Sequence, residues 1–67
     1  MSGIGEKLKK LRDERNYTQK EISSILGIAQ NTYSGYETNK HIPDLEILIK
    51  IADLYKTSVD YIIGRYN

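Results

Sequence analysis

Apolar residues recur along this chain at intervals of three and four positions, the spacing that lines up side chains on one face of an α-helix. In a first segment, at about residues 4–15, the apolar positions are Ile4, Leu8 and Leu11, and Asn16-Tyr17 ends the segment. No run alternates between apolar and polar residues as a half-buried strand does. The pattern therefore predicts an all-α protein.

A second helix is predicted after Thr18-Gln19-Lys20-Glu21, which is a capping box. In this motif the Thr18 hydroxyl accepts a hydrogen bond from the Glu21 amide, and the Glu21 side chain reaches back. Gly27 supplies the left-handed residue that ends the helix. Its expected buried side consists of Ile22, Ile25 and Leu26.

Three further helices complete a compact five-helix domain. The third runs from about Gln30 to Glu37, and Asp44 and Ser58 cap the fourth and fifth. In the loop before the fourth helix, Asn39 suits a position with positive φ. The expected inner stripe of the fourth helix is Leu45, Leu48, Ala52 and Tyr55, widened by Ile47, Ile49, Ile51 and Leu54. In the fifth helix, Val59, Ile62, Ile63 and Tyr66 follow the same helical spacing, and Val59 and Ile62 are expected to cover the core.

The second and third helices, joined by a tight turn at Gly27, form a helix-turn-helix pattern. Large apolar residues take one side of this unit, at Ile28, Tyr33 and Tyr36. The other side of the third helix holds Gln30, Asn31, Ser34 and Gly35. Amides and hydroxyls can pair with base edges in the major groove of DNA, so this face is a candidate for reading DNA sequence.

Charge is unevenly placed along a chain whose formal net charge is only +1. Residues 1–20 hold six basic and three acidic residues, whereas residues 44–67 hold three basic and four acidic ones. A local basic patch attracts phosphate even on a nearly neutral molecule. The same lysines are equally consistent with an ordinary solvated helix face.

Several classes of protein are excluded by what the sequence lacks. There is no cysteine and only one histidine, so neither a disulfide nor a metal cluster is expected. No apolar run approaches the roughly 20 residues of a membrane span, and the start has no signal-peptide core. Without a Gly-rich phosphate loop or a catalytic constellation, an enzyme, a cofactor or a small-molecule ligand is not expected. We expect one cytoplasmic domain over residues 1–67, associated with the nucleoid through DNA, with no effector domain after Asn67.

The stretch from Ile4 to Gly64 resembles the Cro and phage-repressor type of helix-turn-helix protein, the Xre family. The motifs that carry this resemblance are Thr18-Gln19-Lys20-Glu21-Ile22, Leu26-Gly27-Ile28, Tyr36-Glu37, Pro43-Asp44-Leu45-Glu46 and Ser58-Val59-Asp60-Tyr61-Ile62-Ile63-Gly64. The resemblance implies a lambda-repressor-like fold that binds double-stranded operator DNA. It also implies a symmetric dimer that reads a palindrome and represses or activates transcription.

Base reading is assigned by this resemblance to Gln30 and Asn31, helped by Ser34. Two positions depart from the family's pattern. Ala29 replaces the usual Ser or Thr cap of the third helix, and its methyl group could touch a thymine methyl. Gly35 replaces a long polar or basic side chain. Either the backbone approaches DNA closely at Gly35, or the glycine packs under a neighbouring residue.

Phosphate contacts are implied at the start of the second helix and in the loop after the third. The residues concerned are Thr18, Gln19, Lys20, Thr38, Asn39 and Lys40. Lys40 is the best ionic candidate, with Lys7, Lys10 and Lys20 behind it, and His41 lies in the same loop. Tyr33 is expected to pack its ring between helices, with its hydroxyl at the surface near phosphate.

The resemblance also implies an ion pair between Arg12 and Glu37, which ties the first helix to the end of the third. For the homodimer, the residues left over after core packing are Tyr61, Ile63 and Tyr66. One other function stays open for the same fold. A protein-interaction module, such as an antitoxin or an adaptor, would use the polar face of the third helix to bind protein instead of DNA.

Overall fold

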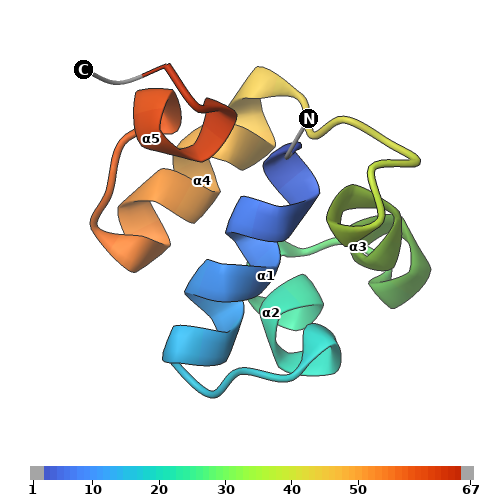
Figure 1. Cartoon of the computed structure of the whole chain (residues 1–67). Coiled ribbons are helices and arrows are strands. Elements are labelled where there is room, and N and C mark those ends of the chain that lie inside the picture. Colours follow the sequence, from blue (N-terminus) through green and yellow to red (C-terminus); the bar gives the residue numbers. More distant parts are fainter. Residues whose placement is uncertain (1–2, 66–67) are drawn as a thin grey trace.

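The computed structural model describes residues 3–65 of the 67-residue chain. In that range the protein consists of five helices: α1 (Ile4–Glu14), α2 (Gln19–Leu26), α3 (Gln30–Glu37), α4 (Leu45–Tyr55) and α5 (Val59–Ile63). Helix α1 runs through the middle of the molecule, with α2 and α3 on one side and α4 and α5 on the other (Figure 1). The predicted all-α fold is confirmed. None of the helices among these residues is long and apolar enough to span a membrane.

The helix ends form as the local sequence predicts. Thr18 Oγ1 accepts a hydrogen bond from the Glu21 amide at 3.0 Å, and the Thr18 amide donates to Glu21 Oε1 at 2.8 Å, which completes the capping box. Asp44 and Ser58 cap α4 and α5 through their side-chain oxygens. Gly27 ends α2 with φ of 74°, and Asn39 has φ of 63° in the loop after α3.

Helix α1 receives its N-terminal cap from a residue that is distant in the sequence. Gly3 at the cap position has no side chain to offer. Instead, Oδ1 of Asn39 accepts a hydrogen bond from the amide of Gly5 at 3.0 Å, across 34 residues of sequence. The positive φ of Asn39 therefore serves a tertiary contact, because it turns the loop so that its side chain reaches the start of α1.

The core is shared by all five helices in the described range. It consists of Leu8, Leu11, Ile22, Leu26, Tyr33, Tyr36, Ile47, Leu48, Ile51, Ala52, Tyr55 and Ile62. Three expected core residues are wrong, since Ile25, Leu45 and Ile49 are 52%, 65% and 45% exposed.

The positions of the buried arcs of α2 and α4 explain the exposure of Ile25 and Ile49, and Leu45 is the first residue of α4. In α2 the buried residues are Ile22, Ser23 and Leu26, so the arc is centred on Leu26 and Ile25 falls outside it. The Ser23 hydroxyl is satisfied inside by donating to the Lys20 carbonyl oxygen. In α4 the buried arc runs through Ile51 and Tyr55, and Ile49 lies on the other side of the helix.

Helices α1 and α3 cross at Gly5. A methyl group at this position would meet the backbone carbonyl groups of Tyr36 and Glu37, which cannot move aside as a flexible side chain can. The sequence pattern does not reveal this contact, because glycine gives no apolar signal. Gly5 lets α1 approach the C-terminal end of α3 closely enough for the contacts described below.

We therefore expect Gly5→Ala to lower the free energy of unfolding by about 1 to 3 kcal/mol, since the added methyl group forces the two helices apart. Chemical denaturation measures this change. Lys10→Ala, at an exposed position of the same helix, is the matched control and should change stability by less than about 0.5 kcal/mol. Equal stability of the two variants would contradict the close approach.

Candidate nucleic-acid interface

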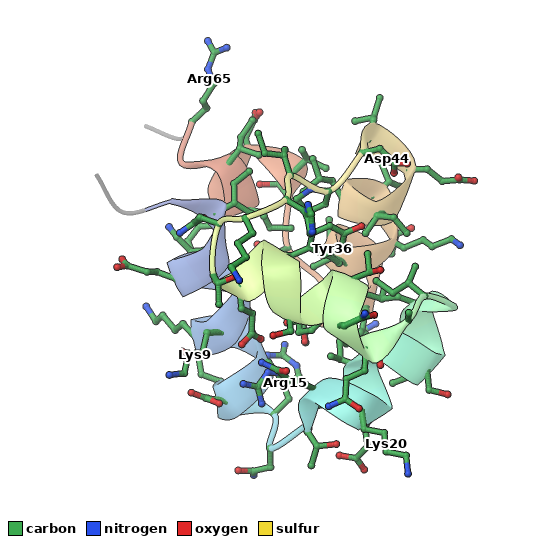
Figure 2. All side chains as sticks on the ribbon, turned by 90° about the vertical axis from the view of Figure 1, so that its right-hand side faces the viewer. Lys9, Arg15, Lys20, Tyr36, Asp44 and Arg65 are labelled. Carbon is green, nitrogen blue, oxygen red and sulfur yellow. The ribbon has the colours of Figure 1, made fainter. Side chains whose placement is uncertain are left out.

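Helix α3 presents its polar residues on the outside of the molecule. Figure 2 looks onto α3, which lies across the front, with α1 to its left and α2 below and to the right. The side chains of Gln30 and Asn31 are exposed, and they form no hydrogen bond within residues 3–65. Ser34, one turn after Gln30 in the same helix, is half-buried. Ala29 takes the N-cap position without a side-chain hydrogen bond, as its methyl group requires.

The inner side of α3 is fixed by the carboxylate of Glu37. It accepts hydrogen bonds from Arg12 Nε at 2.6 Å and Arg12 Nη2 at 3.2 Å. It also accepts from the Tyr33 hydroxyl at 2.6 Å and from Gln19 Nε2 at 3.0 Å. The predicted Arg12–Glu37 pair is present, and both side chains are largely buried, at 13% and 5% exposed. We call these four residues, Arg12, Gln19, Tyr33 and Glu37, the Glu37 cluster.

The protonation states of the Glu37 cluster follow from burial and hydrogen bonding. Burial raises the pKa of Glu37, but the hydrogen bonds from Arg12, Tyr33 and Gln19 outweigh it, so the net pKa lies below the ordinary value of 4.5. The hydrogen bond to Glu37 raises the pKa of Arg12, while burial and the bond to Glu37 both raise that of Tyr33. The cluster therefore holds a carboxylate, a guanidinium and a neutral phenol at neutral pH.

Two predicted phosphate ligands belong to this cluster. Tyr33 is only 1% exposed and its hydroxyl donates to Glu37, so the expected surface position near phosphate is wrong. A buried phenol needs a partner, and Glu37 supplies it. Gln19 is half-buried and donates one N–H of its side-chain amide to Glu37. Its second N–H is available to another acceptor.

Two loop residues are also committed within the protein. The Thr38 hydroxyl donates to the carbonyl oxygens of Ser34 and Gly35, at 3.2 and 3.3 Å, and phosphate oxygens need a donor. Oδ1 of Asn39 caps α1. The interpretation of the Thr38 hydroxyl as a phosphate ligand is therefore not supported, whereas the exposed Asn39 side chain keeps the two N–H groups of Nδ2 for another acceptor. Lys40 and Lys20 are exposed, and Thr18 keeps its hydroxyl hydrogen free, because its oxygen acts as acceptor in the capping box.

Gly35 decides between the two alternatives left open by the sequence. It is buried, and a methyl group at this position would meet the imidazole ring of His41. Gly35 therefore packs under a neighbour, and the expected close approach of its backbone to DNA is wrong.

Two further basic residues, one in α1 and one at its C-cap, contact other helices. Arg15 Nη2 donates to the Tyr55 carbonyl oxygen at 3.0 Å, and its guanidinium lies 5.2 Å from the Tyr55 ring centroid. Lys7 Nζ lies 4.2 Å from the centroid of the Tyr61 ring on α5. Lys7 is thus on the side of α1 opposite to Gly5, away from α3 and from Lys40.

The residues expected at a dimer interface differ in their surroundings. Ile63 is exposed, whereas Tyr61 is half-buried and packs against the core. Tyr66 lies outside the described residues. Within residues 3–65, no group of three His, Asp or Glu side chains is arranged to hold a metal ion.

These features define a helix-turn-helix domain, and comparison with known proteins agrees. A family model described as helix-turn-helix matches residues 8–62, so the chain belongs to this family, of the Xre type predicted from its motifs. The family consists of DNA-binding regulators and not of enzymes.

Relatives of known name are transcriptional regulators. The regulator ImmR of Bacillus subtilis is 40% identical over 62 residues, which cover 92% of this chain and 49% of that protein. The repressor RstR of the cryptic phage CTXphi of Vibrio cholerae is 36% identical over 63 residues, or 94% of this chain and 56% of that protein. The chain spans about half the length of the curated relatives it matches.

Solved structures show the same fold. The biofilm regulator SinR in complex with DNA has a TM-score of 0.79 at 28% identity, over 88% of this chain and 95% of that one. The P22 c2 repressor in complex with a synthetic operator has a TM-score of 0.90 at 20% identity, over 98% of this chain and all of that one. The latter comparison supports the fold alone.

We expect Glu37→Gln to lower the free energy of unfolding by about 3 to 5 kcal/mol, since it leaves the buried Arg12 guanidinium with only the exposed Asp13 carboxylate, at 3.6 Å, as a counter-charge. Thermal and chemical denaturation at neutral pH measure the change. Glu14→Gln, which removes an exposed carboxylate from α1, is the control. A melting temperature equal to the parent's would contradict a structural role for the pair.

The pH dependence gives a second test of the same variant. Because the pKa of Glu37 is lowered on folding, its contribution to stability is present above the unfolded value of about 4.5 and is lost as the pH falls through the folded value. The parent should therefore lose more stability than Glu37→Gln in this acidic range.

Tyr55 and Tyr33 form a matched pair for hydroxyl removal. The Tyr55 hydroxyl is buried without a hydrogen-bond partner among the described residues, and burial raises its pKa to about 12. Tyr55→Phe should leave stability unchanged or raise it by up to about 1 kcal/mol, whereas Tyr33→Phe should lower it by about 1.5 to 3 kcal/mol. Equal changes in stability for the two substitutions would show that the Tyr33–Glu37 hydrogen bond does not stabilise the fold.

Proposed function

We propose that the chain is a sequence-specific DNA-binding domain of a transcriptional repressor, which inserts α3 into the major groove of a palindromic operator. The observation that carries this proposal is the free amide pair, Gln30 and Asn31, on the exposed face of a helix whose inner side is fixed by the Glu37 cluster. A reading helix needs both properties, because base contacts are useful only when the donors and acceptors have a defined position.

Readout rests mainly on those two amides. Either side chain can pair with N6 and N7 of adenine through two hydrogen bonds, each good pair contributing about 1 to 3 kcal/mol of discrimination. Ser34 can reach a neighbouring base edge or a phosphate, and the Ala29 methyl group suits a thymine methyl. The operator half-site is therefore proposed to contain adenine.

Phosphate contacts are proposed at two points on either side of α3. At the start of α2, the Thr18 hydroxyl, the second N–H of Gln19 and the ammonium group of Lys20 are available beside the helix N-terminus, which favours anions. Beyond the other end of α3, Lys40 is exposed in the loop. Such contacts fix the position of the helix on the duplex without reading sequence.

A homodimer is proposed to place two copies of α3 in successive major grooves, roughly 34 Å apart. The exposed Ile63 and the half-buried Tyr61 on α5 are the described residues proposed for the two-fold contact. Relatives named as repressors support regulation by repression.

Selection of bound sequences from a random pool of duplex DNA tests this function. The parent should enrich a palindrome with adenine in each half-site, and Gln30→Ala combined with Asn31→Ala should abolish the enrichment at an unchanged melting temperature. Lys50→Ala on the exposed side of α4 is the control and should enrich the parent's motif. If the parent retains no DNA but captures a protein, the interaction-module alternative replaces the proposal.

The salt dependence of operator affinity checks the phosphate contacts. With three to five contacts per subunit, the log–log slope should be about −0.9 for each phosphate neutralised. Lys40→Ala should reduce the slope by about one contact per subunit, whereas Lys50→Ala should not. A flat salt dependence would contradict DNA binding at this face.

A further inference from the structure

The imidazole of His41 occupies the place that a side chain at position 35 would fill. A methyl group built on Gly35 would meet Cδ2 of His41 first, and both Cγ and Nε2 of the ring lie only 3.2 Å from it. At 100° per residue, position 35 lies about 40° from Asn31 on the helix, on the outer and not the inner side of α3. Gly35 is nevertheless buried, because the ring of His41 covers it.

The backbone holds His41 at this place. The carbonyl oxygen of Gly35 accepts hydrogen bonds from the amides of Lys40 at 2.9 Å and His41 at 3.1 Å. The loop therefore folds back over the end of α3 and is tied to the very residue that the ring covers. The Asn39 side chain, bonded to the start of α1, fixes the same turn from the other side.

The free edge of the ring carries hydrogen-bonding capacity. Cδ2 faces Gly35, so Nδ1 and Cε1, which lie opposite Cδ2 in an imidazole, form the edge directed away from the helix. His41 is exposed overall, and its ring nitrogens have no hydrogen-bond partner within residues 3–65. Nδ1 on this edge can donate or accept one hydrogen bond, depending on the tautomer, and a base edge in the major groove offers both kinds of partner.

We propose that His41 is a specificity-determining residue, which reads the base pair next to the one that Asn31 reads. It does so from the loop, because glycine at position 35 leaves room for the ring on the reading face of α3. This assignment rests on the proposed function, since it requires α3 to lie in the major groove.

Selection from random duplex DNA, run in parallel on the parent and on His41→Ala, tests the assignment. The variant should lose the base preference at one position of each half-site and keep the preferences that depend on Gln30 and Asn31. Its affinity for the parent's operator should fall roughly tenfold, the scale of one lost base contact. Its melting temperature should stay near the parent's, because the side chain is exposed.

Gly35→Ala supplies a second, independent variant. Its methyl group displaces the ring of His41, so it should lose the same base preference as His41→Ala. In the His41→Ala background, Gly35→Ala should have no further effect on the selected motif, which is the non-additivity expected of two residues in contact. Lys40→Ala, in the same loop, is the control and should weaken binding to all sequences equally.

Three results would overturn the assignment, and they have different consequences for the proposed function. If His41→Ala enriches the parent's motif unchanged, the ring only packs on Gly35 and the proposed function survives. If the variant binds all sequences more weakly with a reduced salt slope, His41 contacts phosphate and reads no base. If the parent itself enriches no motif, the proposed function and the assignment fail together.

Discussion

The carboxylate of Glu37 is the constraint on which the helix-turn-helix unit depends. A charge this deeply buried is stable only when donors surround it, and its donors come from α1, α2 and α3. Arg12 fixes the first helix, Gln19 the start of the second, and Tyr33 the third itself. Hydrophobic packing alone tolerates small rotations of a short helix, whereas four hydrogen bonds to one carboxylate do not. The cluster therefore defines which residues of α3 face outwards.

A second constraint acts on the backbone at the same C-terminal end of α3, through a glycine and an asparagine. Gly5 lets α1 touch the carbonyl groups of Tyr36 and Glu37, and Asn39 then closes the start of α1. The two contacts depend on each other, because Asn39 reaches the N-terminus of α1 only when α1 and α3 cross closely at Gly5. The path of residues 38–43 follows from this crossing, and so does the position of His41 on Gly35. The loop is thus part of the folded framework and not a free connection.

Local features of the chain, such as helix caps, are predictable from the sequence, whereas burial and contacts between distant residues are not. The capping box at Thr18, the left-handed Gly27 and the caps at Asp44 and Ser58 depend only on neighbouring residues, so their motifs suffice. Burial of Ile25 and Ile49 depends on which neighbours cover the helix, and periodicity does not distinguish an edge from a centre. The partner of Asn39 lies 34 residues away in the sequence, so no local motif indicates it. Tyr33 donates to Glu37 one turn further along the same helix, but the sequence alone does not show that this carboxylate is buried. The resemblance to the Xre family supplied the Arg12–Glu37 pair, which spacing alone does not indicate.

The way the basic residues are used has a consequence for DNA binding. Arg12 is bound to Glu37, Arg15 to α4, and Lys7 lies over the ring of Tyr61. Half of the six basic residues in the first 20 thus stabilise the fold, in a chain whose net charge is only +1. Non-specific affinity for DNA comes from neutralised phosphates, so it should be weak in such a molecule. The proposed specific binding would then depend on the base contacts proposed for α3, and each of these contacts would contribute a larger share of the affinity than in a strongly basic protein.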